Sequence, residues 1–198
     1  LLNDHTVKAG DETITFKNLI IATGSVPAPN PFKVEDGAPL VNSDGFLELK
    51  ELPKKVLIVG GGVIGLEFAT VLSEFESEVT VVEATPGVLP NMDREVADFA
   101  KSGLEKKGVK FFTGTFVMGV KKKGKKALVE LKTGDKNFEE TADLVVVAAG
   151  RRANTEGLNI KAAGVNTERG FITVDDRCCT NVPHIYAIGD VNGKSMLA

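Results

Sequence analysis

Three glycines with a fixed spacing mark the stretch of this sequence best suited to bind a ligand. Gly60, Gly62 and Gly65 follow an apolar, β-branched run at residues 55–59 and precede a segment with helical spacing. In such a G-x-G-x-x-G arrangement the first glycine allows a tight turn, the second lets a pyrophosphate approach, and the third lets the helix pack close to the sheet. The unpaired N–H groups of the first helical turn would face the phosphates, with the positive end of the helix dipole behind them. The spacing therefore predicts a strand, a turn and a helix that bind a dinucleotide.

An acidic residue at the end of the next expected strand favours this interpretation over a turn without a ligand. Residues 78–82 form that strand, and Glu83 follows it, 23 residues after Gly60. This is close to the roughly 20 residues expected for the acid that binds a ribose 2′-hydroxyl. A carboxylate there would repel a 2′-phosphate, and residues 84–87 contain no arginine to bind one. We therefore expect the cofactor to be NAD rather than NADP.

The central part of the chain predicts an α/β fold with a Rossmann-like parallel sheet. A second helix is expected at residues 92–108 and a third strand at 109–113, which completes a β-α-β-α-β unit. Residues 115–141 predict a three-stranded antiparallel meander, and residues 143–150 predict a parallel strand buried on both faces. One face of the second helix is expected to carry Met92, Val96, Phe99, Ala100 and Leu104.

The outer parts of the chain predict shorter elements. Residues 5–16 alternate around a turn and predict a β-hairpin, in which His5 is expected to be an edge-strand residue without function. Residues 18–25 predict a buried strand that stops at a glycine, and residues 42–49 predict a short helix. A last apolar strand ends at Gly189 and Asp190. The Asp190 carboxylate can accept hydrogen bonds from sugar hydroxyls or cap the following turn, and the spacing alone does not separate these alternatives.

The composition excludes several classes of protein. A net charge of −3 over 198 residues argues against a nucleic-acid or anionic-membrane surface, and the basic run at residues 121–126 is expected to be a hairpin tip. No apolar stretch reaches the roughly 18 residues that a membrane helix needs, and nothing resembles a signal peptide. Cys178 and Cys179 are adjacent, so we expect neither a disulfide framework nor a metal site. A reducing compartment, the cytoplasm or an organelle matrix, fits best, and the start at Leu1 rather than Met suggests a fragment.

Four segments together resemble the flavoprotein pyridine nucleotide-disulfide oxidoreductases. They are residues 21–25 (IATGS), 60–69, 149–154 (AGRRAN) and 186–190 (YAIGD), which occur in the family's order over nearly the whole chain. The resemblance implies an α/β NAD-binding domain at residues 42–151, inserted into an FAD-binding domain that is split into residues 1–41 and 152–198. The two outer pieces would pair with each other across the insertion.

The resemblance also implies which residues bind each cofactor. Glu67 would support the site where nicotinamide and flavin meet, although a solvated helix carboxylate is the alternative. Arg151 and Arg152 could equally pair at the surface or contact a ligand. The residues expected to contact NAD are Gly60, Gly61, Gly62, Val63, Ile64, Gly65, Leu66, Glu67, Glu83, Val117 and Gly150. Those expected to contact FAD are Thr23, Gly24, Ser25, Asp190, Met196, Leu197 and Ala198.

Within this family the sequence is most similar to members that oxidise a dihydrolipoyl group and reduce NAD through FAD and a redox disulfide. This similarity implies a homodimer and a lipoyl-bearing partner protein in a multienzyme complex. The family's flavin-binding glycine motif, its redox cysteine pair and its C-terminal His-Glu base are absent from these residues, so we expect no catalytic residue here and an inactive fragment. The alternatives are a sibling NADH- or NADPH-dependent flavin disulfide reductase of the mercuric, thiol or glutathione type, and a nucleotide-binding module without catalysis.

Overall fold

The computed structural model, described for residues 1–196, divides the chain into two compact units. Unit 1 comprises residues 1–26 and 151–198, and unit 2 comprises residues 27–150. Unit 2 is thus inserted into unit 1, but it begins at Pro27 rather than at the expected residue 42. The reason is that β5 (Lys33–Val34) pairs with β10 and β6 (Leu40–Asn42) pairs with β13, which ties residues 27–41 to the inserted unit.

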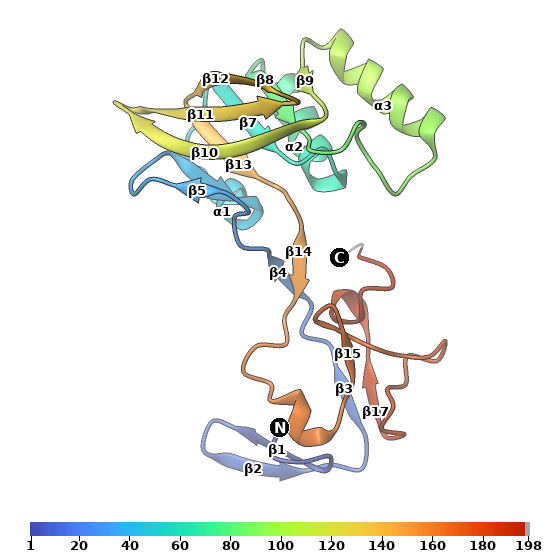
Figure 1. Ribbon diagram of the computed structural model, residues 1–198. Helices are drawn as coiled ribbons and strands as arrows, with labels where there is room; N and C mark the ends of the chain where they lie inside the picture. Colours follow the sequence, from blue (N-terminus) through green and yellow to red (C-terminus); the bar gives the residue numbers. More distant parts are fainter. Residues whose placement is uncertain (197–198) are drawn as a thin grey trace. The chain divides into compact units, whose positions relative to one another are not determined.

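A five-stranded parallel sheet is the centre of unit 2 (Figure 1). Its strand order is β6-β13-β7-β8-β9, so the chain places β8 and β9 on one side of β7 and returns to place β13 on the other. These strands are β7 (Lys55–Val59), β8 (Glu78–Val82), β9 (Lys110–Phe112) and β13 (Leu144–Val147), with β6 at the edge. The helices are α1 (Ser43–Leu47), capped by the Asn42 side chain, α2 (Val63–Glu74) and α3 (Arg94–Lys106). The expected β-α-β-α-β unit is confirmed.

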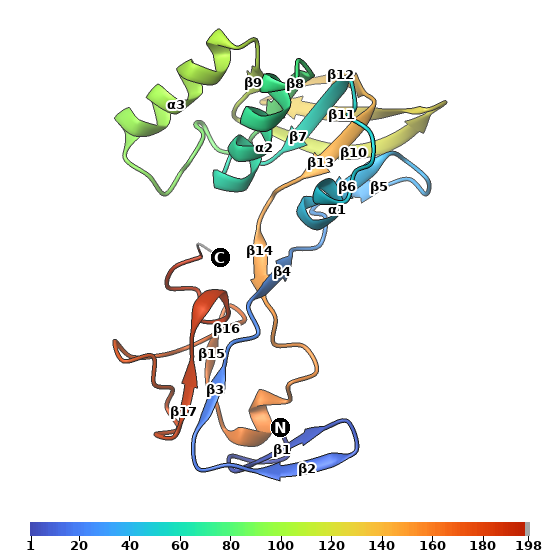
Figure 2. The same cartoon turned by 180° about the vertical axis from the view of Figure 1, so that it is seen from behind.

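The predicted meander is also confirmed, with one strand added. It consists of β10 (Thr115–Lys123), β11 (Lys126–Thr133) and β12 (Lys136–Ala142), and β5 extends it by pairing in parallel with β10. The ladder between β10 and β11 shifts register between Val117 and Gly119, as a β-bulge does. This sheet covers the face of the parallel sheet opposite to the helices (Figure 2).

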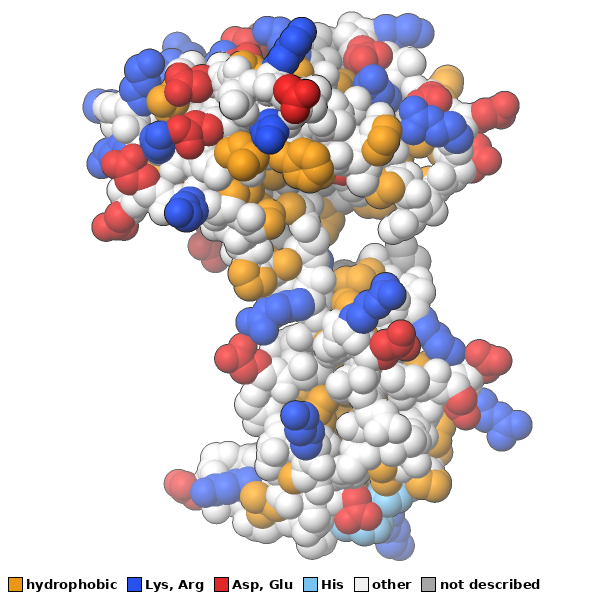
Figure 3. Space-filling view, viewed as in Figure 1, with side chains coloured by type: hydrophobic (Ala, Val, Ile, Leu, Met, Phe, Trp, Pro, Cys, Tyr) orange, Lys and Arg blue, Asp and Glu red, His pale blue; other side chains and the backbone are white. Residues whose placement is uncertain are grey.

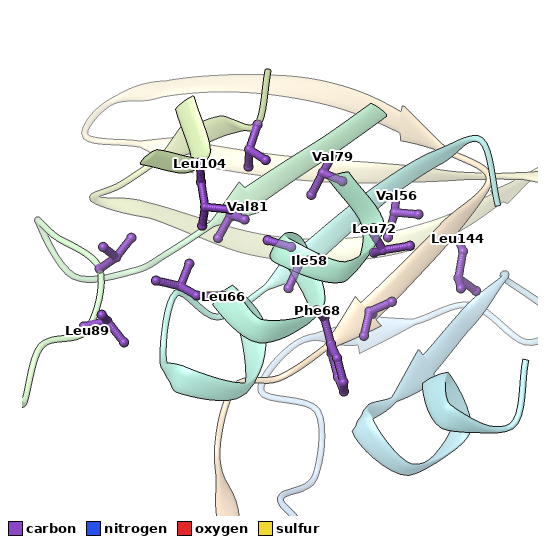
Figure 4. Packing of buried hydrophobic residues seen from close by; sticks show 14 of the residues in the cluster. Val56, Ile58, Leu66, Phe68, Leu72, Val79, Val81, Leu89, Leu104 and Leu144 are labelled. Carbon is purple, nitrogen blue, oxygen red and sulfur yellow. The ribbon is translucent and has the colours of Figure 1, made fainter. Parts of the chain in front are cut away.

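The alternation of side chains along the parallel strands explains why both faces are covered. Val56 and Ile58 of β7 belong to the core under the helices, whereas Leu57 and Val59 belong to the core under the meander. Figure 4 shows the first core, in which Leu66, Phe68 and Leu72 of α2 lie against strand residues such as Ile58. Burying each such aliphatic side chain contributes about 1.5–3 kcal/mol. This two-sided burial is why the strands are continuous apolar runs in the sequence.

Helix α3 buries only part of the face that the sequence predicted. Met92, Val96 and Phe99 are exposed, and Phe99 retains 83% of its accessible surface. Leu104 is buried and Ala100 packs beside it, as expected, whereas the buried Ala97 was not predicted on this face. The Lys101 ammonium lies 5.6 Å from the centre of the Phe111 ring. The helix also begins at Arg94, because the Asp93 carboxylate accepts hydrogen bonds from the amides of Glu95 and Val96.

Unit 1 is built from short paired strands around a smaller core. The expected hairpin is β1 (Thr6–Ala9) with β2 (Glu12–Thr15), and β3 (Leu19–Ile21) pairs in parallel with β17 (Ile185–Ala187). The two outer pieces of the chain therefore do pair with each other. The strand expected at 18–25 is shorter than predicted, and Ile20 is 61% exposed because β3 belongs to a sheet of only two strands. The other elements are β4 (Ser25–Pro27) with β14 (Arg151–Ala153), β15 (Thr167–Glu168) with β16 (Phe171–Ile172), and the 3₁₀ turns η1 (Ile160–Ala163) and η2 (Gly189–Asn192).

No helix among the described residues is long and apolar enough to cross a membrane.

Candidate functional site

The glycine turn between β7 and α2 is held by close backbone contacts. The Gly60 amide donates to the Val82 carbonyl at 2.8 Å, and the Gly61 carbonyl accepts from the Leu89 amide at 2.8 Å. Gly60 has φ of +112°, and a Cβ at this position would lie 2.5 Å from the Ala148 carbonyl oxygen. Only glycine can therefore link this strand to the helix while lying against the end of β13.

The other two glycines of the motif differ from each other in what surrounds them. A Cβ on Gly65 would lie 2.0 Å from the Gly60 carbonyl oxygen, so this glycine allows α2 to approach the turn. A Cβ on Gly62 would meet nothing within 4 Å. Gly62 is the N-cap of α2, and no side chain of the cap bonds to the first amides of the helix. Such a helix start attracts an anionic group.

The Glu83 side chain lies against this turn at the end of β8. It is only 9% exposed. Its Oε2 accepts the Gly61 amide at 2.6 Å, and its Oε1 accepts the Thr85 amide at 2.7 Å. The Thr85 hydroxyl lies 2.8 Å from Oε1 and 2.7 Å from the Gly87 carbonyl oxygen, and its one proton can serve only one of these acceptors. A carboxylate offers about four acceptor positions, so the two amides, with or without the Thr85 hydroxyl, leave at least one position for a further hydroxyl. The structure therefore brings together the glycine turn and the acid that the spacing predicted, and adds Thr85, which no sequence signal had indicated.

The remaining residues expected at the same site have varied environments. Val63 is exposed, Ile64 is half-buried, and Leu66 is buried in the core under α2, so a contact from Leu66 would come from its backbone. Glu67 is exposed on α2. Gly150 follows β13, two residues after the carbonyl that contacts Gly60.

Val117 lies on a separate feature of the surface. It lines a shallow hollow of about 560 Å³ on the meander. The walls of this hollow include neither the glycine turn nor Glu83, and its lining residues are Pro31, Phe32, Phe116, Val117, Met118, Lys132 and Gly134.

A second group of expected residues meets within unit 1. The Ser25 hydroxyl donates to Asp190 Oδ2 at 2.6 Å, and Arg151 donates from Nε to the Ser25 hydroxyl at 2.7 Å and from Nη2 to the Ser25 carbonyl at 2.8 Å. Asp190 is 4% exposed, and its Oδ1 is buried without a hydrogen-bond partner in the described part of the chain. A buried carboxylate oxygen left in this state favours a ligand that donates a hydrogen bond, such as a sugar-type hydroxyl. Neither Asp190 oxygen caps the turn η2 in the hydrogen bonds described, so the alternative of a turn cap is not supported.

The neighbouring segments are joined by reciprocal hydrogen bonds. The Thr23 hydroxyl donates to the Asn154 carbonyl at 2.7 Å, the Asn154 side chain donates to the Thr23 carbonyl at 3.1 Å, and the Asn154 amide donates to the Gly24 carbonyl at 2.9 Å. Arg152 instead pairs with Glu156 at the surface. Met196 is 39% exposed, whereas Leu197 and Ala198 lie outside the described residues. Segments more than 120 residues apart in the sequence thus form one polar cluster.

Known proteins resemble the chain over its whole length. The pyridine nucleotide-disulphide oxidoreductase family matches residues 1–198. A dihydrolipoamide dehydrogenase of Chaetomium thermophilum is 42% identical over 98% of this chain, and a dihydrolipoyl dehydrogenase of Bacillus subtilis is 40% identical over 92%. These alignments cover 40% and 39% of the two relatives, so the chain spans about two fifths of their length.

A solved structure agrees with this family. The HOCl-induced flavoprotein disulfide reductase RclA from Escherichia coli superposes with a TM-score of 0.87 at 32% identity, covering 98% of this chain and 45% of that one. The chain belongs to the pyridine nucleotide-disulphide oxidoreductase family.

Proposed function

We propose that this chain is the NAD-binding part of a dihydrolipoyl dehydrogenase, together with two pieces of its FAD-binding domain. The observation that carries the proposal is the Glu83 carboxylate, buried against the glycine turn with at least one acceptor position left. The open space at Gly62 suits a pyrophosphate, and Glu83 suits the ribose hydroxyls of the same dinucleotide. The relatives named dihydrolipoyl dehydrogenase support the assignment of the parent enzyme.

Electrostatics in this part of unit 2 favour NAD over NADP. A 2′-phosphate would bring its charge to the Glu83 carboxylate, which would repel it. Arg94 is the arginine that packs on the loop after Glu83, because its guanidinium lies against Gly87. That guanidinium is already engaged by Asp98, with Nη2–Oδ1 at 2.5 Å and Nε–Oδ2 at 3.0 Å. Asp98 thus balances part of the positive charge that a 2′-phosphate would meet on this arginine.

The residues of unit 1 fit a flavin cofactor. Asp190 Oδ1 would accept a hydroxyl of the ribityl chain, and Ser25 and Arg151 would hold the carboxylate in place through Oδ2. In the whole enzyme FAD and NAD supply the hydride chemistry, and the protein supplies orientation and electrostatics. Glu67 on α2 would act near the nicotinamide, where an exposed carboxylate can accept a hydrogen bond or balance a charge. The whole enzyme would be a homodimer that acts on a lipoyl-bearing protein, in the cytoplasm or an organelle matrix, and the present residues alone would not turn over.

The RclA likeness keeps a second candidate open, namely a sibling flavin disulfide reductase that acts on another substrate. The two candidates share the nucleotide site and differ in their redox disulfide and substrate groups. The preference for NAD or NADP separates the two candidates in part, since an NADPH-dependent sibling would bind NADP more tightly than NAD.

Calorimetric titration with NAD, NADP and FAD tests the proposal. Glu83→Ala removes a hydrogen bond to a charged group, about 1.5–3 kcal/mol, so it should weaken NAD binding about 10- to 100-fold and should narrow the preference for NAD over NADP. Glu83→Gln keeps an acceptor for Gly61 but removes the charge, so it should narrow the preference with a smaller loss of NAD affinity. Asp135→Asn, in the exposed turn between β11 and β12, changes the net charge equally and should alter neither affinity. An unchanged preference in both Glu83 variants would refute the role of this residue.

A further inference from the structure

The two histidines of the chain meet at the surface of unit 1, beside an aspartate. His5 and His184 stack with their ring centroids 4.1 Å apart and their planes within 4°. Asp4 Oδ2 lies 3.8 Å from His5 Nε2, and one ligand atom from each of the three residues lies within 4.8 Å of the other two. The histidine side chains, pale blue in Figure 3, reach the viewed face next to an acidic side chain. This cluster takes no part in either nucleotide site described above.

Backbone carbonyls fix which nitrogen of each ring carries the proton. His5 Nδ1 lies 3.2 Å from the Phe16 carbonyl oxygen, and His184 Nε2 lies 2.7 Å from the Asp4 carbonyl oxygen. A carbonyl oxygen can only accept, so these two nitrogens donate. In the neutral rings, His5 Nε2 and His184 Nδ1 therefore keep their lone pairs. Histidines that bind a metal almost always donate their other N–H to a carbonyl or a carboxylate, which is the arrangement present on both rings.

We propose that Asp4, His5 and His184 form a binding site for Zn²⁺ or a similar divalent transition metal. Imidazole nitrogen and carboxylate oxygen are common zinc ligands, and three protein ligands leave a fourth position for water. Ligand atoms on a tetrahedral zinc ion lie about 3.3 Å apart, given metal–ligand distances of about 2.0 Å. The 3.8 Å between His5 and Asp4 is already close to this spacing.

The two exposed side chains of the cluster are free to move toward an ion. The side chains of His5 and Asp4 are 57% and 51% exposed, so His5 can tilt out of the ring stack and Asp4 can turn toward the ion. His184 is half-buried at the start of β17 and gives the site its fixed side. No spacing pattern in the sequence indicates such a site, because 179 positions separate the two histidines.

Nuclear magnetic resonance of the imidazole protons during a Zn²⁺ titration tests the proposal. The chain has only two histidines, so His5→Gln assigns both sets of signals. We expect both rings to shift and saturate together at one equivalent of Zn²⁺, and Mg²⁺, which prefers oxygen ligands, to shift neither. Zinc affinity should fall about tenfold or more in His5→Gln and in His184→Gln.

The adjacent cysteines are the main competing zinc ligands, so the titration is made in a Cys178→Ser, Cys179→Ser background as well. Asp11→Asn, at the exposed turn between β1 and β2, is the matched control for Asp4→Asn and should leave zinc binding unchanged. His5→Gln alters an exposed side chain, so it keeps the test decisive if His184→Gln fails to fold. Zinc binding that leaves the imidazole signals unshifted, or that disappears with the two cysteines and not with His5, would overturn the proposal.

Discussion

At the scale of single residues, the glycine turn shows how one missing side chain can set the position of a helix. The Gly65 Cα faces the Gly60 carbonyl oxygen, and both are backbone groups that cannot swing aside. Replacement of Gly65 must therefore move α2 away from the turn and from the core residues beneath it. The substitution would act by disturbing the packing of α2. It would also affect the proposed nucleotide site, because the first amides of the same helix would bind the phosphates.

We expect Gly65→Ala to lower the free energy of unfolding by about 2–4 kcal/mol, since the added Cβ would lie 2.0 Å from the Gly60 oxygen. Gly103→Ala, inside α3, is the matched control: an added Cβ meets nothing within 4 Å and should stabilise the chain by up to about 1 kcal/mol. Urea unfolding followed by circular dichroism measures both. Equal effects of the two substitutions would show that the close approach at Gly65 relaxes without cost.

The sequence predicted the positions of these residues, because each position depends on spacing within one strand-turn-helix unit. Glu83 was placed correctly at the end of β8 by its distance from Gly60. Its partners Gly61 and Thr85 were not foreseen, since a hydrogen bond depends on side-chain direction and not on spacing alone. The Ser25 and Asp190 contact spans 165 positions and could be anticipated only through family resemblance.

At the scale of elements, α3 shows that hydrophobic periodicity alone does not determine which side of a helix is buried. An amphipathic pattern defines which residues share a face, but two adjacent stripes of α3 carry apolar side chains. The sheet contacts the side of α3 that carries Ala97 and Ala100 together with Leu104, because the two small alanines let the helix lie close to it. The larger Phe99 is left in solvent, contrary to what its hydrophobicity suggested. Tertiary packing, and not local preference, decided between the two faces.

This choice of face predicts a contrast between two substitutions on α3. Leu104→Ala should lower the free energy of unfolding by about 2–4 kcal/mol, because Leu104 is only 6% exposed in the core under the helix. Phe99→Gln should change it by less than about 0.5 kcal/mol, since Phe99 is 83% exposed and glutamine is a good helix former. Chemical denaturation of the two variants measures both changes in the free energy of unfolding. A large loss in Phe99→Gln would show that the helix packs on its other face.

Asp143 links the meander to the parallel sheet at the start of β13. Its Oδ2 accepts the Lys55 amide at 2.9 Å, and its Oδ1 lies 3.1 Å from the Lys126 ammonium. Partial burial would by itself raise the pKa of Asp143, but the hydrogen bonds from Lys126 and the Lys55 amide together hold that pKa below its usual value. The carboxylate is therefore stabilised in the folded state relative to the unfolded chain.

The sign of the pH dependence follows from that depressed pKa. The stabilising contribution is fully present above the unfolded-state pKa, near about 3.9, and is lost as the pH falls through the lower folded-state pKa. Asp143→Asn should thus cost about 1 kcal/mol at pH 7, and the difference from the unsubstituted chain should shrink below about pH 4. Unfolding curves across this range measure it, with Asp11→Asn as an exposed control. A difference that stays constant down to pH 2 would contradict the assignment.

At the scale of the whole molecule, the chain passes from unit 1 to unit 2 and back through adjacent segments. The Ala28 amide donates to the Gly150 carbonyl at 3.0 Å, so the two ends of unit 2 lie side by side. Unit 2 contains the parallel sheet with both of its cores, whereas unit 1 is built from pairs of short strands around one core. The sequence indicated an insertion only through resemblance. The boundary expected at residue 42 differs from the start of the compact unit at Pro27, because the short strands β5 and β6 pair within unit 2.

This arrangement predicts that residues 27–150 fold without the rest of the chain. Both faces of their parallel sheet are covered from within the unit, and their ends meet, so excision exposes little of either core. Expressed alone, the segment should unfold in one cooperative transition and bind NAD with the affinity of the whole chain, because every residue assigned to NAD lies within it. The same segment with Gly65→Ala should be less stable and bind NAD more weakly. Circular dichroism tests whether the segment folds, and calorimetry tests whether it binds NAD. A failure to fold is therefore distinguished from a failure to bind. A disordered segment would show that the inserted unit depends on unit 1, and a folded segment without NAD affinity would count against the nucleotide site alone.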